Sequence, residues 1–455
     1  MSELGNLCQL RRDATTIFRA GLNAVDAEEA VRRHVQIDVP AYRLHLSSGD
    51  SLSLSQFKRA FAVGAGKAAA PMAFALEQLI APVFEPQGII NVKYGHTSPR
   101  PRFIHIHEAG HPLPDSSGVE GTRRIEQLVG GLADTDLLFV LISGGASALL
   151  AAPAEGISLE EKQQTTDLLL RSGADIYELN AVRKHLSSVK GGQLALRARP
   201  ATVVSLILSD VIGDRLDVIG SGLTSYDPST FEDAERVLRK YNLLERVPAS
   251  VRDRLREGCS GHIPETPKSI NTFSEGVHNL IVGSNRLAIE AAADAARSLG
   301  YNTAILSSTL QGETRVVARV HAEILREVIS SGNPVQRPAC LLSGGETTVS
   351  VRGSGTGGRN QEFSLAAALA VSGLRNTVVL AAGTDGTDGP TDAAGALVDG
   401  TTAARAGARG FCLIDHLARN DAYSLLDAVD DLLRTGSTGT NVMDLNIMLA
   451  GEDCC

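Results

Sequence analysis

Short apolar runs alternate with longer stretches of helical periodicity along most of the chain. The runs rich in Val, Ile, Leu and Ala are predicted strands: residues 60–66, 88–94, 102–108, 137–143, 202–209, 279–284, 302–307, 339–345 and 377–384. Near-continuous apolar runs are typical of strands that are covered on both faces. Their alternation with helices predicts an α/β fold with mainly parallel sheets flanked by helices.

Helix-capping residues and prolines predict where helices and domains begin and end. Residues 158–173 begin with Ser158 and Glu161 in capping-box spacing and end at a glycine, and residues 285–300 run from Asn to Gly. Residues 347–351 alternate polar and apolar positions, which favours an edge strand. Residues 241–278 lack long apolar runs and contain three prolines. We therefore expect a boundary near residue 270, with domains at 1–270 and 271–455.

Composition narrows the class of protein. A chain of 455 residues with 43% hydrophobic and 21% charged residues is expected to form two or three globular domains. Its net charge of −9 argues against nucleic-acid and anionic-membrane partners. The six cysteines lack zinc-binding spacing, which predicts reduced thiols and a cytoplasmic location. Many of the 45 glycines end apolar runs, as in enzymes whose backbone closely approaches a ligand.

Two strand ends in the first half suit anions. Gly64 and Gly66 precede Lys67 at a predicted helix start, where helix dipole and lysine both favour phosphate or carboxylate; the alternative is a tight turn with a surface lysine. Residues 143–145 read Ser-Gly-Gly, followed by Ser147, and consecutive N–H groups there would form an anion nest. A nucleophilic Ser143 is disfavoured because the glycine of G-x-S-x-G is missing before it.

A basic stretch and an acidic strand end follow. In an acidic protein the cluster of Arg183 and Lys190, a heptad apart, suits a small anionic ligand. We expect Lys184 to be solvated and His185 to be a buried, hydrogen-bonded imidazole. Asp210 ends a strand, as a Mg²⁺ ligand or general base would; turn or capping duty is the alternative.

The second half repeats the Ser-Gly-Gly ending at 343–345, followed by Glu346. The glycines at 353, 355 and 358 match G-x-G-x-x-G only weakly, because the preceding segment is not an apolar strand. Arg359 and Asn360 open a predicted helix, where the arginine could bind a phosphoryl group through two hydrogen bonds. Asp385 lies in a Gly- and Asp-rich loop that fits Mg²⁺-nucleotide or hydroxyl binding, with a plain acidic turn as the alternative.

Several motifs occur in a fixed order: GAGKAA, EAGHPLPD, LISGGASALL, VRKHLS-x-x-KGG, LSDVIGD, LLSGGETTV, GGRNQEF and STGTNV. From about residue 10 to 450 the chain resembles the ATP-dependent glycerate 2-kinases whose C-terminal part is a MOFRL domain. The sequence GSGLTSYDP departs from the family at Gly220 and Leu223, where Ala and Pro are expected, without loss of a charge.

The resemblance implies transfer of the ATP γ-phosphate to the C2 hydroxyl of D-glycerate. It implies a Rossmann-like N-terminal domain, a MOFRL-type C-terminal domain and an active site in the interdomain cleft. It assigns the catalytic pair to Lys67 and Arg359, a clamp on the transferred group that needs charge neutralisation more than covalent chemistry.

The remaining roles are hypotheses. The 143–145 loop, with Arg183 and Lys190, would hold the carboxylate or phosphoryl oxygens. Gly344, Gly345 and Glu346 would form the facing wall, and Asp210 or Asp385 would bind Mg²⁺ or accept the hydroxyl proton. An NAD(P)-dependent hydroxypyruvate reductase and a non-catalytic ligand sensor are the alternative functions. The oligomeric state stays open, with a homodimer as one alternative.

Overall fold

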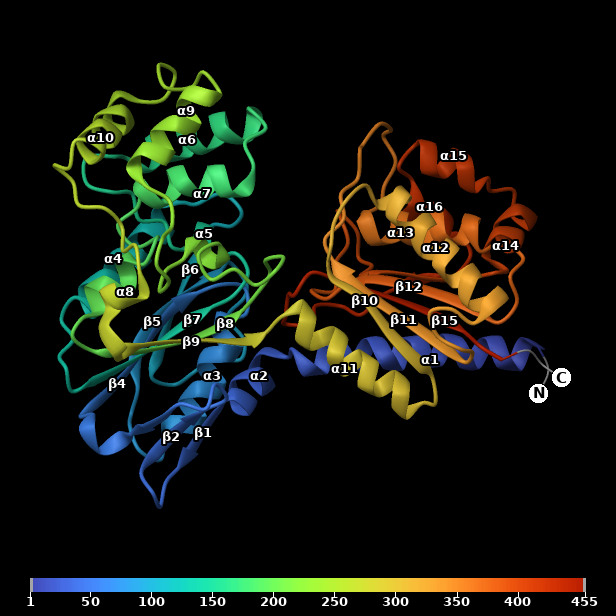
Figure 1. Cartoon of the computed structure of the whole chain (residues 1–455), viewed down its shortest axis with the longest axis horizontal. Coiled ribbons are helices and arrows are strands. Elements are labelled where there is room, and N and C mark those ends of the chain that lie inside the picture. The colour runs from blue at the N-terminus through green and yellow to red at the C-terminus, as the bar shows by residue number, and fades with distance from the viewer. Residues whose placement is uncertain (1–2, 453–455) are drawn as a thin grey trace. The chain divides into compact units, whose positions relative to one another are not determined.

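The computed structural model describes residues 3–452 and divides the chain into two compact units. One unit comprises residues 27–282, and the other combines residues 1–26 with 283–455. Both contain a six-stranded sheet flanked by helices, which confirms the α/β class (Figure 1). No helix in the described part of the chain is both long and apolar enough to cross a membrane.

The unit of residues 27–282 is built on the strand order β6-β5-β4-β7-β8-β9. Neighbouring strands from β6 to β8 pair in parallel, so their carboxyl ends share one edge of the sheet. A small antiparallel sheet, β1-β2-β3, accompanies it. The strands are β1 Val35–Asp38, β2 Arg43–Leu46, β3 Ser51–Ser53, β4 Arg59–Ala65, β5 Gln87–Lys93, β6 Ile104–Ala109, β7 Asp136–Ile142, β8 Thr202–Leu208 and β9 Val277–Gly283.

Helices of this unit contribute to two separate hydrophobic cores. Apolar residues of α4 and α8 join the core of the large sheet, whereas α6, α7, α9 and α10 enclose a hydrophobic core of their own. We call this second group the helical cluster (Figure 1). The helices are α2 Ala27–His34, α3 Ala69–Ile80, α4 Ser116–Val129, α5 Ala146–Leu149, α6 Leu159–Arg171, α7 Ile176–His185, α8 Gln193–Ala198, α9 Phe231–Lys240 and α10 Ala249–Cys259, with short 3-10 turns η1 Leu54–Gln56, η2 Ile219–Ser221 and η3 Ile270–Gly276.

The second unit has the strand order β10-β11-β15-β12-β13-β14. Strands β10, β11, β12 and β14 run in one direction, while β13 and β15 run in the other, because β15 is inserted antiparallel between β11 and β12. The strands are β10 Asn302–Leu310, β11 Ala339–Gly345, β12 Thr377–Gly383, β13 Gly395–Asp399, β14 Leu432–Leu433 and β15 Asp444–Ala450. Sequence patterns predicted β10, β11 and β12 but missed the other three.

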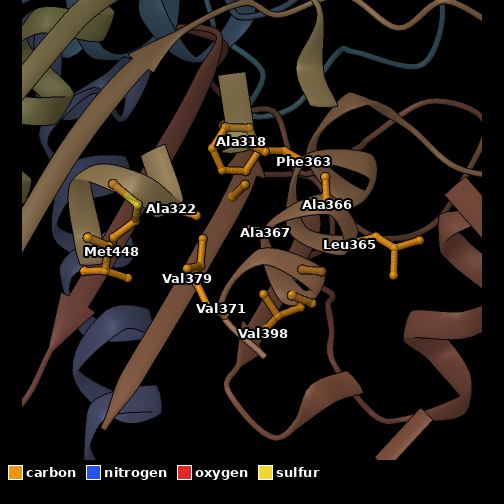
Figure 2. Close-up of a cluster of buried hydrophobic side chains, with 14 of the residues drawn as sticks. Ala318, Ala322, Phe363, Leu365, Ala366, Ala367, Val371, Val379, Val398 and Met448 are labelled. Carbon is orange, nitrogen blue, oxygen red and sulfur yellow. The ribbon is translucent and has the colours of Figure 1, made fainter. Parts of the chain in front are cut away.

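Helices cover both faces of this second sheet. The pair α1 and α11 packs on one face, and α12 and α13 pack on the other (Figure 1). Figure 2 shows Phe363 of α13 beside Ala318 and Ala322 of α12 in the core over β12. The helices are α1 Glu3–Ala24, α11 Asn285–Ser298, α12 Thr314–Ser331, α13 Arg359–Ala370, α14 Thr402–Ala408, α15 Leu413–Ala418 and α16 Ala422–Ala428.

The compact units differ from the expected domains of 1–270 and 271–455 at both ends. Helix α1 belongs with the C-terminal part, where Arg11 pairs with Asp399 and Asp431, and the Tyr301 hydroxyl donates to Asp13 at 2.7 Å. Strand β9 extends the first sheet beside β8, so that sheet ends beyond residue 270. A break in apolar content marks a loop, but it does not show which sheet accepts the next strand.

Local signals were more reliable. The predicted capping box is present at α6, with reciprocal hydrogen bonds between Ser158 and Glu161. Residues 347–351, expected as an edge strand, form only an isolated bridge at Thr348. Cysteines 8, 259, 340 and 412 are free thiols. Cys454 and Cys455 lie outside the described residues.

Candidate active site

Three predicted groups meet at the carboxyl edge of the first sheet. Lys67 follows β4, the Ser-Gly-Gly loop follows β7, and Asp210 follows β8. Strands β4, β7 and β8 are adjacent and parallel, so the sheet itself brings these strand ends together. This is the edge at which open α/β sheets bind their ligands.

The turn after β4 is joined to the loop after β7. The Lys67 N–H donates to the Gly144 carbonyl at 2.9 Å, and the Ala68 N–H donates to Ser143 Oγ at 3.1 Å. Gly66 has φ +144°, and a Cβ there would lie 1.9 Å from Ser143 Oγ. Only glycine therefore allows this approach. The backbone of Lys67 is fixed by these contacts, and its partly exposed side chain is left for other contacts.

Gly64 has a different reason to be glycine. It lies within β4, and a Cβ there would lie 1.9 Å from the Leu141 carbonyl oxygen of β7. We predicted Gly64 as part of an anion-binding turn. Close pairing of two strands accounts for the glycine at this position, and its part in anion binding stays a prediction.

The loop at 143–147 presents backbone N–H groups that are available as hydrogen-bond donors. Among the residues that the structure describes, no group accepts a hydrogen bond from the N–H of Gly144 or of Gly145. Gly145 has φ +88°, in the left-handed region, and turns the chain into α5 next to the ring of His111. Successive N–H groups in such a turn make the anion-binding concavity predicted from the sequence.

Ser147 is the last residue of this segment; it lies in the short helix α5 and contacts two cations. Its Oγ accepts from Arg183 Nη2 at 2.8 Å and from Lys190 Nζ at 2.6 Å. Lys190 also donates to the Ser147 carbonyl at 2.7 Å. We predicted that Arg183 and Lys190 share a helix face, but α7 ends at His185; a common hydroxyl brings them together instead.

A cavity of about 390 Å³ opens beside Ser147. Its lining includes Lys162 of α6 in addition to Arg183 and Lys190. Leu159 and Leu179 contribute apolar surface. We call this space the cation cavity. The cation cavity lies where the helical cluster meets the 143–147 loop. The start of this loop is bonded to the backbone of Lys67, and its last residue, Ser147, lines the cavity.

The cations of this cavity form no ion pair with an acid in the described part of the chain. Among the side chains that the structure describes, no Asp or Glu oxygen lies within ion-pair distance of Lys162, Arg183 or Lys190. Burial lowers the pKa of all three, and Arg183 lowers the pKa of both lysines further; that of Lys162 falls to about 7. An anionic ligand would relieve this repulsion.

Asp210 and a group of basic residues complete the sheet edge. Burial raises the pKa of Asp210, and nearby Lys67 limits the rise. Burial also lowers the pKa of His111 to about 4, followed by the effects of Lys67, Lys93 and His96. Our sequence reasoning missed Lys93, His96 and His111, although Lys93 is the last residue of β5, and His96 and His111 follow β5 and β6 as Lys67 follows β4.

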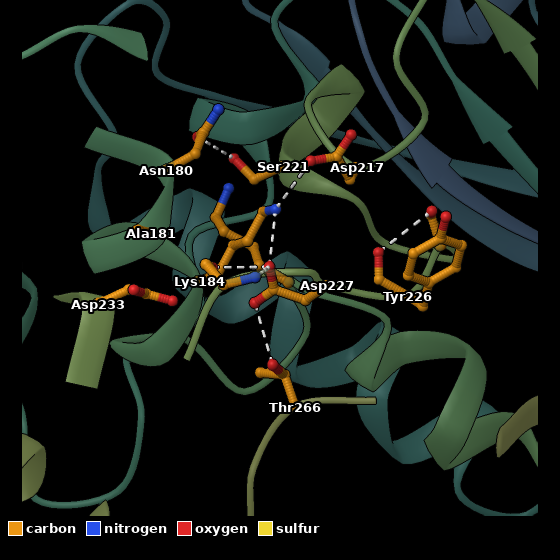
Figure 3. Close-up of polar contacts among 12 residues, drawn as sticks. Asn180, Ala181, Lys184, Asp217, Ser221, Tyr226, Asp227, Asp233 and Thr266 are labelled. Atoms are coloured by element: carbon orange, nitrogen blue, oxygen red, sulfur yellow. Dashed lines mark hydrogen bonds and ion pairs between the residues drawn. The ribbon is translucent and has the colours of Figure 1, made fainter. Parts of the chain in front are cut away.

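Lys184 does not lie on the solvated face that we expected. It is 2% exposed, and its Nζ lies 3.0 Å from Asp227 and 3.6 Å from Asp217 (Figure 3). The Asp227 carboxylate also accepts from Thr266 at 2.9 Å. This buried network joins α7 to the loops after β8, and it therefore supports the helix that carries Arg183. The expectation for His185 is confirmed: its ring contacts the Ala181 carbonyl and Glu265.

In the second unit, Arg359 begins α13 and is bound by carboxylates. Its Nε lies 2.6 Å and its Nη2 3.0 Å from the oxygens of Asp444, and its Nη1 lies 2.9 Å from Glu346. Burial lowers its pKa, but the hydrogen bonds and charges of these acids raise it overall. The bidentate partner in this structure is thus an aspartate that our sequence reasoning did not single out.

Asp388, not Asp385, holds the start of α13. Its carboxylate accepts from the N–H groups of Asn360 and Gln361 at 3.1 and 2.8 Å. Asn360 Nδ2 also donates to Asp388 and Asp444. Asp385 Oδ1 accepts from the N–H and hydroxyl of Thr387 at 3.0 Å, which is the acidic turn that we gave as the alternative.

The second Ser-Gly-Gly copy is not equivalent to the first. Gly344 and Gly345 belong to β11, which pairs with both β10 and β15, and the Glu346 N–H donates to the Leu310 carbonyl. Because the backbone groups of residues 344–346 are paired with these neighbouring strands, they do not form a nest like the loop at 143–145. The difference is that β11 continues through its two glycines to Gly345, whereas β7 ends at Ile142, before its Ser-Gly-Gly.

The 353–358 loop does not have the context of a dinucleotide fingerprint. No strand immediately precedes it in the described residues 346–358, and its glycines pack closely on their own surroundings. A Cβ at Gly353 would lie 2.2 Å from the Arg419 carbonyl, and one at Gly358 would lie 2.3 Å from Asp388. These glycines are thus explained by packing within the second unit.

Single carboxylates, rather than clusters, characterise the predicted metal positions. Among the described residues there is no group of three or more His, Cys, Asp or Glu side chains that could hold a metal ion. Asp210 and Asp385 remain individual predicted ligands. This donor set fits Mg²⁺ that reaches an enzyme with nucleotide phosphates and water, since Mg²⁺ commonly takes only one or two carboxylates from the protein.

The fold and the strand-edge residues define an α/β protein with basic side chains and open backbone N–H groups around the 143–147 loop. Comparison with known sequences is specific: residues 13–256 match a domain of unknown function (DUF4147), and residues 339–444 match the MOFRL family. The chain is 44% identical over 440 residues to a D-glycerate 2-kinase of Thermotoga maritima, covering 97% of this chain and 98% of that protein. A glycerate 2-kinase of Pyrococcus horikoshii is 43% identical, with 86% and 87% covered.

The crystal structure of glycerate kinase from Thermotoga maritima resembles this structure with a TM-score of 0.86 at 41% identity, covering 97% of this chain and 99% of that chain. A relative from Agrobacterium vitis, 41% identical over 86% of this chain and all of its own length, carries a provisional hydroxypyruvate reductase name. The chain therefore belongs to the glycerate 2-kinase family with a MOFRL domain in its C-terminal part, as the ordered motifs predicted.

Proposed function

We propose that the protein transfers the γ-phosphate of ATP to the C2 hydroxyl of D-glycerate, giving 2-phosphoglycerate. The observation that carries this proposal is the 143–147 loop, which is bonded to the Lys67 backbone at its start and to Arg183 and Lys190 at its end. In glycerate the reacting hydroxyl is on the carbon next to the carboxylate. Groups for a phosphoryl oxygen and for a carboxylate must therefore lie close together, as this loop arranges them.

The carboxylate of D-glycerate would enter the cation cavity. Arg183 and Lys190 already converge on Ser147 Oγ, and a carboxylate can accept hydrogen bonds from both cations. Their burial makes the interaction stronger than on a solvated surface. This places binding energy on the end of the substrate that does not react and holds the C2 hydroxyl toward the sheet edge.

Charge on the transferred group would be neutralised by Lys67 and Arg359. Lys67 precedes α3 and stands beside the open N–H groups of Gly144 and Gly145, and Arg359 is the first residue of α13. Phosphoryl transfer depends chiefly on such neutralisation and on alignment of the reacting oxygens. Glu346 and Asp444 hold the Arg359 guanidinium in a fixed orientation, which reduces the entropy lost when it binds phosphate.

Asp210 would accept the proton of the C2 hydroxyl or contact Mg²⁺. Burial raises its pKa, which moves a carboxylate toward the range useful for a general base. Mg²⁺, when bound with ATP, would supply further neutralisation of phosphate charge, with Asp210 as its protein ligand and Asp385 as the second assignment. We place the reaction in the cytoplasm, since the four described cysteines are free thiols.

The test is a reaction of purified protein with ATP, Mg²⁺ and D-glycerate, followed by NMR identification of the phosphorylated carbon. We expect phosphate on C2 and stoichiometric ADP. Phosphate on C3 would contradict the regiochemistry. Oxidation of NADH with hydroxypyruvate, in the absence of ATP turnover, would favour the reductase, and ligand binding without either reaction would favour a sensor.

A further inference from the structure

Lys162 is a buried cation that the sequence motifs did not indicate. It lies in the first half of α6, its residue is 8% exposed, and its Nζ donates to the Ala152 carbonyl at 3.2 Å. It lines the cation cavity together with Arg183 and Lys190. A lysine at this position in an amphipathic helix would ordinarily extend to solvent, yet this one turns into the protein.

Burying this charge costs stability unless something compensates for it. Lys184, in the neighbouring helix α7, shows the usual solution, because two aspartates surround it. Lys162 has no such partner among the described residues; the charges that act on it are the repelling Arg183 and Arg254 and the more weakly attracting Glu126. Three cations line this cavity and none of them is paired with an acid of the described chain. An anion that binds there would supply the missing counter-charge.

The surroundings of Lys162 favour a carboxylate held away from bulk water. Leu159 and Leu179 line the same cavity and exclude water from part of it. Asp167, the acid of this lining, pairs with Arg171 at 2.8 Å and thus does not neutralise the cations. In such surroundings an ammonium–carboxylate contact is stronger than at an exposed surface.

We propose that Lys162 binds the carboxylate of the acceptor substrate together with Arg183 and Lys190, and that this third cation makes the enzyme selective for 2-hydroxycarboxylates over uncharged polyols. The proposal rests on the proposed function for the identity of the acid. It adds a residue to substrate recognition and leaves phosphate handling to Lys67 and Arg359. The enzyme then selects its acceptor by the negative charge of the carboxylate, which is the end of the acceptor that does not react.

The test is Lys162→Met, which keeps much of the side-chain volume and removes the charge. We expect KM for D-glycerate to rise about 10- to 100-fold, the range of one charge-assisted hydrogen bond, while KM for ATP changes less than about threefold. Discrimination between D-glycerate and glycerol as acceptors should fall by a similar factor. Lys240→Met is the matched control, since Lys240 is an exposed lysine of the same helical cluster.

A structural role is separated by stability and binding. Thermal unfolding of the unliganded Lys162→Met variant should occur at the same or a higher temperature, because an uncompensated buried charge is removed. Calorimetric titration with D-glycerate alone measures substrate binding independently of phosphoryl transfer. If the wild type bound D-glycerate but had no kinase activity, this result would contradict the proposed function and would not affect the inference about Lys162. Unchanged glycerate affinity, or unfolding of both Lys162→Met and Lys162→Gln, would assign Lys162 to the structure and overturn the inference.

Discussion

The guanidinium of Arg359 donates to both oxygens of Asp444, from Nε at 2.6 Å and from Nη2 at 3.0 Å. The two residues are 85 positions apart and meet because α13 begins where β15 does, beside the ends of β11 and β12. This contact fixes the plane of the arginine before any ligand arrives. It also reduces the net charge that Arg359 offers to phosphate.

Asp444→Asn tests the orienting role of this contact. In Asp444→Asn we expect kcat to fall about tenfold, because the Arg359 guanidinium loses the carboxylate that orients it. In Arg359→Lys we expect kcat to fall at least a hundredfold, because a lysine cannot replace a planar, bidentate donor. Steady-state kinetics with ATP and D-glycerate measure both. Equal activity of Arg359→Lys and the wild type would remove Arg359 from the reaction.

Lys67→Ala should reduce kcat by at least two orders of magnitude, in the range of lost electrostatic stabilisation of a transition state. Its melting temperature should stay close to that of the wild type, because the structural bond from residue 67 to Gly144 uses the backbone N–H. Lys58→Ala is the control: Lys58 is exposed at the other end of β4, and its N–H likewise bonds to a neighbouring loop, at Thr135. Near-normal turnover of Lys67→Ala would exclude the proposed role.

Lys184→Met should destabilise the protein by about 3–5 kcal/mol, because the buried Asp227 loses its cation, whereas Asp217 keeps its pair with Arg215. The same substitution at Lys162 should not destabilise, since no acid is left unpaired there. Urea unfolding of the two variants compares them directly. A similar loss of stability in both would mean that Lys162 has a compensating partner in the folded protein.

The pH dependence of stability should carry a contribution from Lys162. Burial and the charges of Arg183 and Arg254 lower its pKa to about 7, while Glu126 raises it slightly. A lowered lysine pKa favours the folded state at high pH, and this contribution is lost as the pH falls from about 10.5 toward 7. Lys190 acts in the same direction. The stability gained by the wild type between pH 7 and 9 should therefore shrink in Lys162→Met; an unaltered slope would contradict the shifted pKa.

Asp388 should affect the pH dependence of stability in the opposite direction to Lys162, and at lower pH. Burial, with a contribution from Asp444, raises its pKa to about 6 despite hydrogen bonds from Asn360 and Gln361. Its stabilising contribution is therefore complete below about 3.8 and is lost as the pH rises through about 6. The free energy of unfolding of Asp388→Asn relative to the wild type should increase across this interval. A constant difference between the two proteins would show that Asp388 titrates normally.

The sequence by itself determined the α/β class, the strands of the first sheet and the capping box at Ser158 and Glu161, because apolar periodicity and capping are properties of neighbouring residues. It also indicated Lys67 and the 143–147 loop, since the carboxyl end of a parallel strand can be located from the strand alone.

Only the tertiary structure decided which residues share an environment. It placed α1 with the C-terminal unit, inserted β15 between β11 and β12, and thereby made the second Ser-Gly-Gly part of a sheet while the first remained an open loop. Lys184 and Lys162 look alike as lysines in helices, yet one is neutralised by aspartates and the other faces a cavity. Burial and pairing depend on contacts between distant segments, and a local pattern contains no record of them.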